Sequence, residues 1–319
     1  MVTACSGPRS AEAGGGDRIT VVSTISPLTN LVHNVGGDRV EVIGIVPEGA
    51  DSHTFEPAPS DARVLADADV VFLNGLDLEE PTRALAEGTV RDGAQIVALG
   101  ERAIGPRDYI FDPNFPRSEG DPNPHLWTDP VYAKTYARII CDRLGEIDPA
   151  NAGFYSSNLR LLSRRLDRLD DLARAVTSTV PVRNRRLLTY HDSFPYFARR
   201  YGWKVIGAIQ PSDFSDPTPR EVADLIDQVR ELDLPAIFGS EVFPSPVLEQ
   251  IARESGADYV DDLRDDDLPG SPGDPDHSYL GLMVFDLTTF MGALGGETEA
   301  LDTLDTANLV DDADVSYRQ

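Results

Sequence analysis

The chain has 319 residues, 41% of them hydrophobic and 26% charged, which allows two domains and matches an ordinary globular composition. Acidic residues outnumber basic ones by 54 to 28, and the formal net charge of −26 disfavours binding to nucleic acid or anionic lipid over most of the surface. No stretch approaches the roughly 20 apolar residues that span a bilayer, which argues against an integral membrane protein.

Residues 1–16 are interpreted as a tether to a membrane. The small residues that precede Cys5 are typical of the end of a bacterial lipoprotein signal, in which a cysteine receives lipid. We expect Cys5 to be acylated; a chance cysteine in a flexible tail is the alternative. The second cysteine, Cys141, lies in a helical pattern and is expected to be a buried small hydrophobe. Two cysteines provide neither a disulfide framework nor a cysteine-based zinc site.

Residues 17–149 alternate short β-branched runs with helical patterns, which predicts βαβ units and a mostly parallel sheet. The expected strands are 19–23, 40–46, 70–74 and 95–99, and the expected helices are 27–35, 59–66 and 81–86. Residues 100–124 are rich in proline, glycine and aspartate and are predicted to form a long surface loop.

Residues 150–180 carry the clearest helical periodicity in the chain. Apolar residues recur in alternating steps of three and four, which predicts one long amphipathic helix. The apolar positions are Leu159, Leu162, Leu166, Leu169, Ala173 and Val176. At ~1.5 Å per residue such a helix would be about 43 Å long, so it could run along a whole domain.

Residues 181–319 repeat the alternation of strands and helices. The expected strands are 186–190, 204–208, 236–240 and 259–261, and helices are expected after residue 216, at 247–255 and at 279–294. Thr218 and Glu221 form a capping box around Pro219, which predicts a helix start. An acidic tail from residue 297 has no assigned role.

Four potential metal ligands fall in matching contexts. His53 and His191 follow expected strands, His125 follows the long loop, and Asp261 ends the last expected strand. Because parallel sheets bind ligands at the carboxyl ends of their strands, we expect the four to converge, with two from each half. Three imidazoles and one carboxylate suit a divalent transition metal, whereas calcium or magnesium would need more oxygen ligands.

Other residues compete for roles at this site. Asp261 lies in an acidic run, so Asp262 is an alternative fourth ligand. His277 could approach the site, although a loop or helix-start role is favoured. His33 is expected to be structural.

The flanking sequences resemble the zinc and manganese solute-binding lipoproteins known as cluster A-I. The resemblance rests on PEGADSHTFEPAPSD at 47–61, NPHLWTDP at 123–130 and YHDSFPYFARRYG at 190–202. Shorter matches are NGLDLE at 74–79, FGSE at 238–241 and YVDDL at 259–263. These motifs occur in the order expected for the family, and the resemblance covers residues 17 to 295.

The resemblance implies an α/β fold of two lobes, each a mostly parallel four-stranded sheet flanked by helices, joined by the rigid helix at 150–180 with the metal between them. It implies that His53, His125, His191 and Asp261 hold the metal. Manganese-dedicated relatives often carry glutamate at the third position, so the histidine here favours zinc over manganese.

The resemblance further implies a binding protein for import, not an enzyme. Its partners would be a membrane permease driven by an ATPase and a metallochaperone, with a lipid anchor at the membrane and no nucleic acid. We expect a monomer located outside the cytoplasm, in the periplasm or on the outer face of the cell membrane.

Three carboxylates are candidates to support the histidines, because metal-bound imidazoles usually donate their second N–H to a carboxylate or carbonyl. These are Glu56, Asp129 and Glu241, and each could equally be a helix-end charge or part of a surface salt bridge. A zinc hydrolase with Glu241 as its base is a competing hypothesis, but the chain lacks the metalloprotease helix with two histidines four residues apart. A surface adhesin with a vestigial metal site is a third hypothesis.

Overall fold

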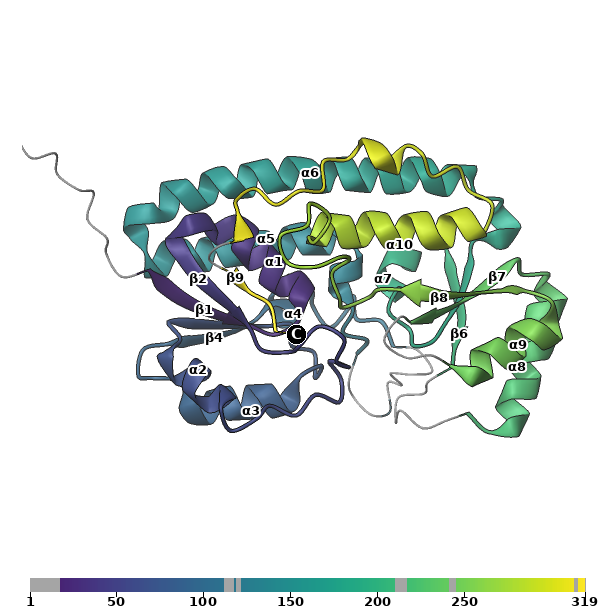
Figure 1. Cartoon of the computed structure of the whole chain (residues 1–319), viewed down its shortest axis with the longest axis horizontal. Coiled ribbons are helices and arrows are strands. Elements are labelled where there is room, and N and C mark those ends of the chain that lie inside the picture. Colours follow the sequence, from purple (N-terminus) through teal and green to yellow (C-terminus); the bar gives the residue numbers. More distant parts are fainter. Residues whose placement is uncertain are drawn as a thin grey trace, which may run out of the picture.

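Two α/β lobes lie beneath one long helix in the computed structural model of the chain (Figure 1). The structure describes residues 18–111, 118, 122–209, 217–240, 245–312 and 315–318. Cys5 and Glu241 therefore lie outside the described residues, and the expectations for them are not tested.

The N-terminal lobe is built on a five-stranded parallel sheet with the order β4-β3-β1-β2-β9. Its strands are β1 (Ile19–Ser23), β2 (Val40–Gly44), β3 (Val70–Leu73), β4 (Gln95–Ala98) and β9 (Val315–Ser316). All four residues of β3 are buried, as expected for a central parallel strand covered on both faces. The first four strands confirm the sequence prediction, whereas β9 was not predicted because it is only two residues long.

The described residues of this half of the chain form five α-helices. They are α1 (Ser26–Gly36), α2 (Asp61–Asp67), α3 (Glu80–Thr89), α4 (Leu99–Ala103) and α5 (Pro130–Ile147). Asp129 begins α5 by accepting a hydrogen bond from the Val131 amide at 2.9 Å. The helix α4 occupies the start of the segment predicted to be a loop, and its five residues are too few to show a helical period. Cys141 is buried in α5, as predicted.

The long helix α6 (Ala152–Thr179) runs across both lobes (Figure 1). The predicted apolar stripe is buried except for Leu159, which is partly buried. Helices α1, α5 and α10 (Tyr279–Ala293) pack against α6, so the two lobes share one hydrophobic core along it.

The C-terminal lobe contains two parallel strand pairs, β5–β6 and β7–β8. The strands are β5 (Arg186–Thr189), β6 (Lys204–Ala208), β7 (Ala236–Ser240) and β8 (Asp258–Leu263), and β5 lies beside β7. The helices before α10 are α7 (Pro195–Tyr201), α8 (Pro219–Leu232) and α9 (Pro246–Ser255). The capping box before α8 is confirmed, since the Thr218 and Glu221 side chains each accept the other's backbone N–H.

The segment after α10 returns from the C-terminal lobe to the N-terminal lobe. It passes a short 3-10 helix at Leu301–Thr303 and ends beside β2, where β9 pairs in parallel with Val42 and Ile43. A division of the chain at 181–319 therefore separates β9 from the sheet to which it belongs. Pairing with β9 satisfies backbone groups that would otherwise be exposed at the β2 edge.

Within the described residues, no helix combines the length and the apolar character that crossing a bilayer requires.

Candidate metal centre

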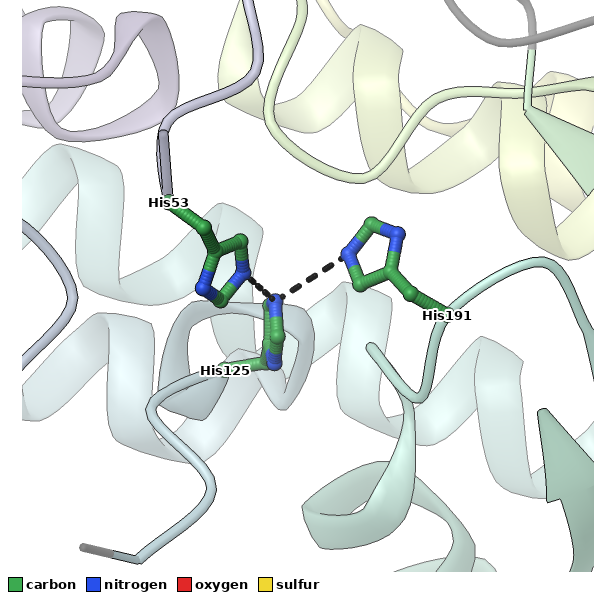
Figure 2. Close-up of side chains that lie close together, drawn as sticks. All are labelled: His53, His125 and His191. Carbon is green, nitrogen blue, oxygen red and sulfur yellow. Dashed lines mark hydrogen bonds between the residues drawn. The ribbon is translucent and has the colours of Figure 1, made fainter. Parts of the chain in front are cut away.

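Three histidines meet between the lobes, and each comes from a different segment of the fold (Figure 2). His53 lies in the loop after β2, where the Asp51 side chain accepts a hydrogen bond from its backbone amide at 2.9 Å. His125 immediately precedes the short 3-10 helix Leu126–Thr128. His191 follows β5 at the carboxyl end of that strand. The structure thus brings together the three predicted histidines.

Two of the three separations between ring nitrogens match those of tetrahedral metal ligands, and all three nitrogens lie within 4.8 Å of one another. The Nε2 atom of His125 lies 3.1 Å from Nε2 of His53 and 3.3 Å from Nε2 of His191. Zinc–nitrogen bonds of about 2.0–2.1 Å at tetrahedral angles separate two ligand nitrogens by about 3.3 Å. One ion can therefore contact all three imidazoles with little rearrangement.

A carboxylate, that of Asp265, contacts one member of this cluster, His191. Its Oδ2 atom is 2.5 Å from His191 Nε2 and accepts a hydrogen bond from the Ser193 hydroxyl at 2.6 Å. Its backbone carbonyl accepts a hydrogen bond from the Trp127 indole at 2.6 Å. Asp265 is buried, so its negative charge is held near the imidazoles and away from water.

Asp261, the expected fourth ligand, lies apart from the three clustered histidines in the structure. Asp261 lies within β8 and is exposed, as is Asp262. The strand continues to Leu263, and the chain reaches the histidines only after a turn in which the Arg264 amide donates to the Asp286 side chain at 2.9 Å. The sequence prediction ended the strand at residue 261, whereas β8 extends to Leu263, and the acidic residue that contacts His191 is Asp265.

The described supporting candidates also lie elsewhere. Glu56 is exposed in the loop that carries His53. Asp129 is buried, but it caps α5 and forms an ion pair with Arg200 at 2.5 Å. His277 is buried 3.4 Å from a Glu48 carboxylate oxygen, outside the three-histidine cluster.

His33 is buried in α1, which agrees with its predicted structural role. Its Nε2 atom lies 3.2 Å from a carboxylate oxygen of Asp312. This contact joins α1 to the segment after α10.

Asn123 supports His125, a role that sequence reasoning missed. Its Oδ1 atom accepts hydrogen bonds from the His125 amide at 3.0 Å and from the His125 ring Nδ1 at 2.9 Å. The first bond identifies the Asn123 atom as the oxygen, so Nδ1 carries the ring proton. Nε2 then directs its lone pair toward the other two histidines, as in metal sites that fix the imidazole tautomer.

A strained turn after β3 supports the same segment. Leu76 and Asp77 both have positive φ, at 55° and 63°. The buried Glu79 carboxylate holds this turn by accepting the Asn74 amide at 2.7 Å. The Asn74 side chain then donates to the carbonyl of Pro124 at 3.1 Å, one residue before His125. Backbone strain of this kind is often found where a fold must hold a functional group.

The histidines differ in their protonation. Burial, reinforced by the charge of His191, lowers the pKa of His53 to about 3. Burial also lowers the pKa of His125 well below its usual value. Burial acts in the same direction on His191, but the Asp265 carboxylate outweighs it and raises that pKa to about 9. At neutral pH the His53 and His125 imidazoles are therefore uncharged and can donate a nitrogen lone pair to a metal. His191 instead forms an ion pair with Asp265.

Comparisons with known proteins identify related sequences along most of the chain. The family profile described as zinc-uptake complex component A periplasmic (ZnuA) matches residues 21–293. The manganese-binding lipoprotein MntA of Halalkalibacterium halodurans is 28% identical over 295 residues, covering 92% of this chain and 94% of the relative. The iron-binding protein YfeA of Yersinia pestis is 28% identical over 278 residues, covering 87% of each.

A solved structure has the same fold. The periplasmic zinc-binding protein TroA of Treponema pallidum superimposes with a TM-score of 0.79 at 25% identity. The match covers 87% of this chain and 99% of TroA.

Proposed function

The chain belongs to the ZnuA family of metal-binding proteins of ABC importers, and from this premise we propose that it captures zinc and delivers it to its importer. Members of the family are substrate-binding proteins and not enzymes, so the zinc hydrolase hypothesis is set aside. The chain binds a divalent metal as cargo for a membrane permease and its ATPase.

The proposed ligands are the three clustered histidines and Asp265. The observation that carries this assignment is the convergence of three Nε2 atoms, 3.1 and 3.3 Å apart, beside one buried carboxylate. Four protein ligands would complete a tetrahedral shell and leave no position for a reacting water. A closed shell of this kind suits the capture and release of an ion.

The preference for zinc is supported by the ligand chemistry. Imidazole nitrogen suits zinc, whereas manganese favours a larger share of oxygen ligands. His191 supplies the third nitrogen at a position where a carboxylate would have shifted this balance. The named metals of the relatives range over manganese, iron and zinc, so manganese is the alternative cargo.

A competition between zinc and manganese tests this proposal. The metal-free protein would be titrated with each ion in parallel, and manganese-loaded protein would then be challenged with equimolar zinc. We expect zinc to bind more tightly and to displace manganese. Retention of manganese against zinc would instead establish the manganese alternative.

We also propose that the protein is anchored outside the cytoplasm through Cys5. The support is the sequence around Cys5 and the description of MntA as a lipoprotein. Incorporation of labelled fatty acid in cells that express the chain fused behind a bacterial lipoprotein signal would test the anchor. Labelling should disappear in Cys5→Ser and persist in Cys141→Ser.

A further inference from the structure

The segment from Leu301 to Arg318, here named the clasp, lies beyond the family match that ends at residue 293. Its described part, 301–312 and 315–318, crosses α6 and α1 before it reaches the N-terminal sheet (Figure 1). On α6, Arg165 donates to the Ala307 carbonyl and forms an ion pair with Asp305. These contacts attach the clasp to the helix that both lobes share.

The clasp is then fixed to α1 by side-chain amides. Asn30 and Asn34 both donate to the Asn308 side-chain oxygen at 2.9 Å. The Leu309 amide donates to the Asn34 side chain at 2.8 Å. Because these groups are largely buried, each bond would be costly to leave unmade, which keeps the clasp in one path over α1.

The end of the clasp contacts both ends of the loop that carries His53. Residues 45–60 contain neither a helix nor a strand, and His53 lies in the middle of them. One nitrogen of the Arg318 guanidinium, Nη1, donates to the Ile45 carbonyl at 3.2 Å and to the Asp61 carboxylate at 2.7 Å. The Arg318 carbonyl also accepts the Glu48 amide at 2.9 Å. A single residue therefore joins the two ends of this loop.

The far side of the same loop is attached to the segment that carries Asp265. The Gly49 amide donates to the Asp267 carboxylate at 2.6 Å. The loop is thus held between Arg318 on one side and the Asp265 segment on the other. Without the first attachment, the loop could sample more conformations, and metal binding would have to order it again.

We propose that the clasp positions His53 for the metal, with Arg318 as the positioning residue. The inference rests on the proposed function, since it assigns His53 a metal to bind. It adds a dependence of metal retention on a segment outside the family match. Arg318 does not contact the three-histidine cluster; it acts through the ends of the loop.

The experiment compares three variants loaded with cobalt(II), whose visible absorption reports tetrahedral coordination, and with zinc. The paired variant Asp61→Asn/Arg318→Ala opens the loop without leaving a buried carboxylate unpaired. Arg318→Lys keeps one cationic nitrogen, which suffices because a single nitrogen makes both contacts. Arg165→Ala releases the clasp from α6 but leaves the loop attachment intact.

In the paired variant we expect the visible absorption of bound cobalt to be weaker. Zinc should transfer to an excess chelator about tenfold faster or more, which is the size of effect seen when other residues that orient metal ligands are replaced. Arg318→Lys and Arg165→Ala should keep the wild-type spectrum and transfer rate. Wild-type values in the paired variant would overturn the clasp proposal alone. A wild-type protein without a tetrahedral cobalt spectrum would overturn the proposed function and, with it, this inference.

Discussion

His191 differs from the other two cluster histidines because it pairs with Asp265 at 2.5 Å. Its pKa of about 9 lies above the usual value near 6.5, so in the metal-free protein it carries a proton at neutral pH. His53 and His125 do not, because burial lowers their pKa values. The sequence alone would have placed competition by protons near the ordinary histidine pKa. The pairing of His191 with Asp265 moves the competition between protons and metal to higher pH.

We therefore predict that zinc binding near pH 7 releases about one proton per ion. A bound metal replaces the His191 proton, so affinity should rise up to about tenfold per pH unit as pH increases toward 9 and then level off. Calorimetric titrations in buffers with different ionisation enthalpies measure the released protons directly. Release of none, or of two or more, would contradict the assigned protonation states.

Asp265 and Asp261 provide a matched pair for testing the fourth ligand. Asp265→Asn removes the charge beside His191 and is expected to weaken zinc binding by about 100-fold or more, beyond the usual effect of a supporting residue. Asp261→Asn alters an exposed side chain of β8 and should leave the affinity unchanged. The dissociation constants of the two variants for zinc, measured by competition with a chelator, decide which aspartate is the fourth ligand. The reverse ranking would identify Asp261 as that ligand.

At the residue scale, sequence patterns predicted the three histidines that cluster but not the carboxylate that contacts His191. Each histidine stands alone near a strand end or loop, whereas Asp265 is one of several acidic residues after β8. The choice depends on where the strand ends and on the turn fixed by Asp286, a contact 22 positions away in the chain. Asn123 was missed for a similar reason, since an amide two residues before a histidine has no distinctive pattern.

The helix α6 is the element whose sequence determined its structure most directly. Its apolar period predicted both its extent and its buried face, and the capping box similarly predicted the start of α8. The elements that were missed are short or depend on tertiary contacts. The five-residue α4 shows no period, and the two-residue β9 is defined by its pairing with the edge strand β2.

Core packing along α6 should dominate the stability of the molecule. Leu169 is fully buried, and we predict that Leu169→Ala lowers the free energy of unfolding by about 2–5 kcal/mol. Arg164 is exposed on the opposite face, so Arg164→Ala should change that free energy by no more than about 0.5 kcal/mol. Urea unfolding of the metal-free variants measures both; equal effects would contradict the assigned face of the helix.

The two lobes are joined by more than α6. The Trp127 indole donates to the Asp265 carbonyl, and the Tyr279 hydroxyl donates to the Trp127 carbonyl at 2.7 Å. The clasp adds a further link between the halves of the molecule (Figure 1). Such connections oppose a wide hinge and favour local rearrangement at the metal site.

We expect zinc binding to change the radius of gyration by no more than about 1 Å, as in other preorganised binding proteins. Small-angle scattering of the metal-free and zinc-loaded protein provides this comparison. A contraction of several ångströms would show that the lobes close as rigid bodies despite these links.

The central claim is that one zinc ion is held by three imidazoles and the carboxylate of Asp265. A crystal structure of the zinc-loaded protein tests it most directly. We predict Nε2 of His53, His125 and His191 at about 2.0–2.1 Å from the ion and an Asp265 oxygen at about 2.0–2.2 Å. An ion bound elsewhere, or coordinated by Asp261 or by water in place of one of these side chains, would contradict the account.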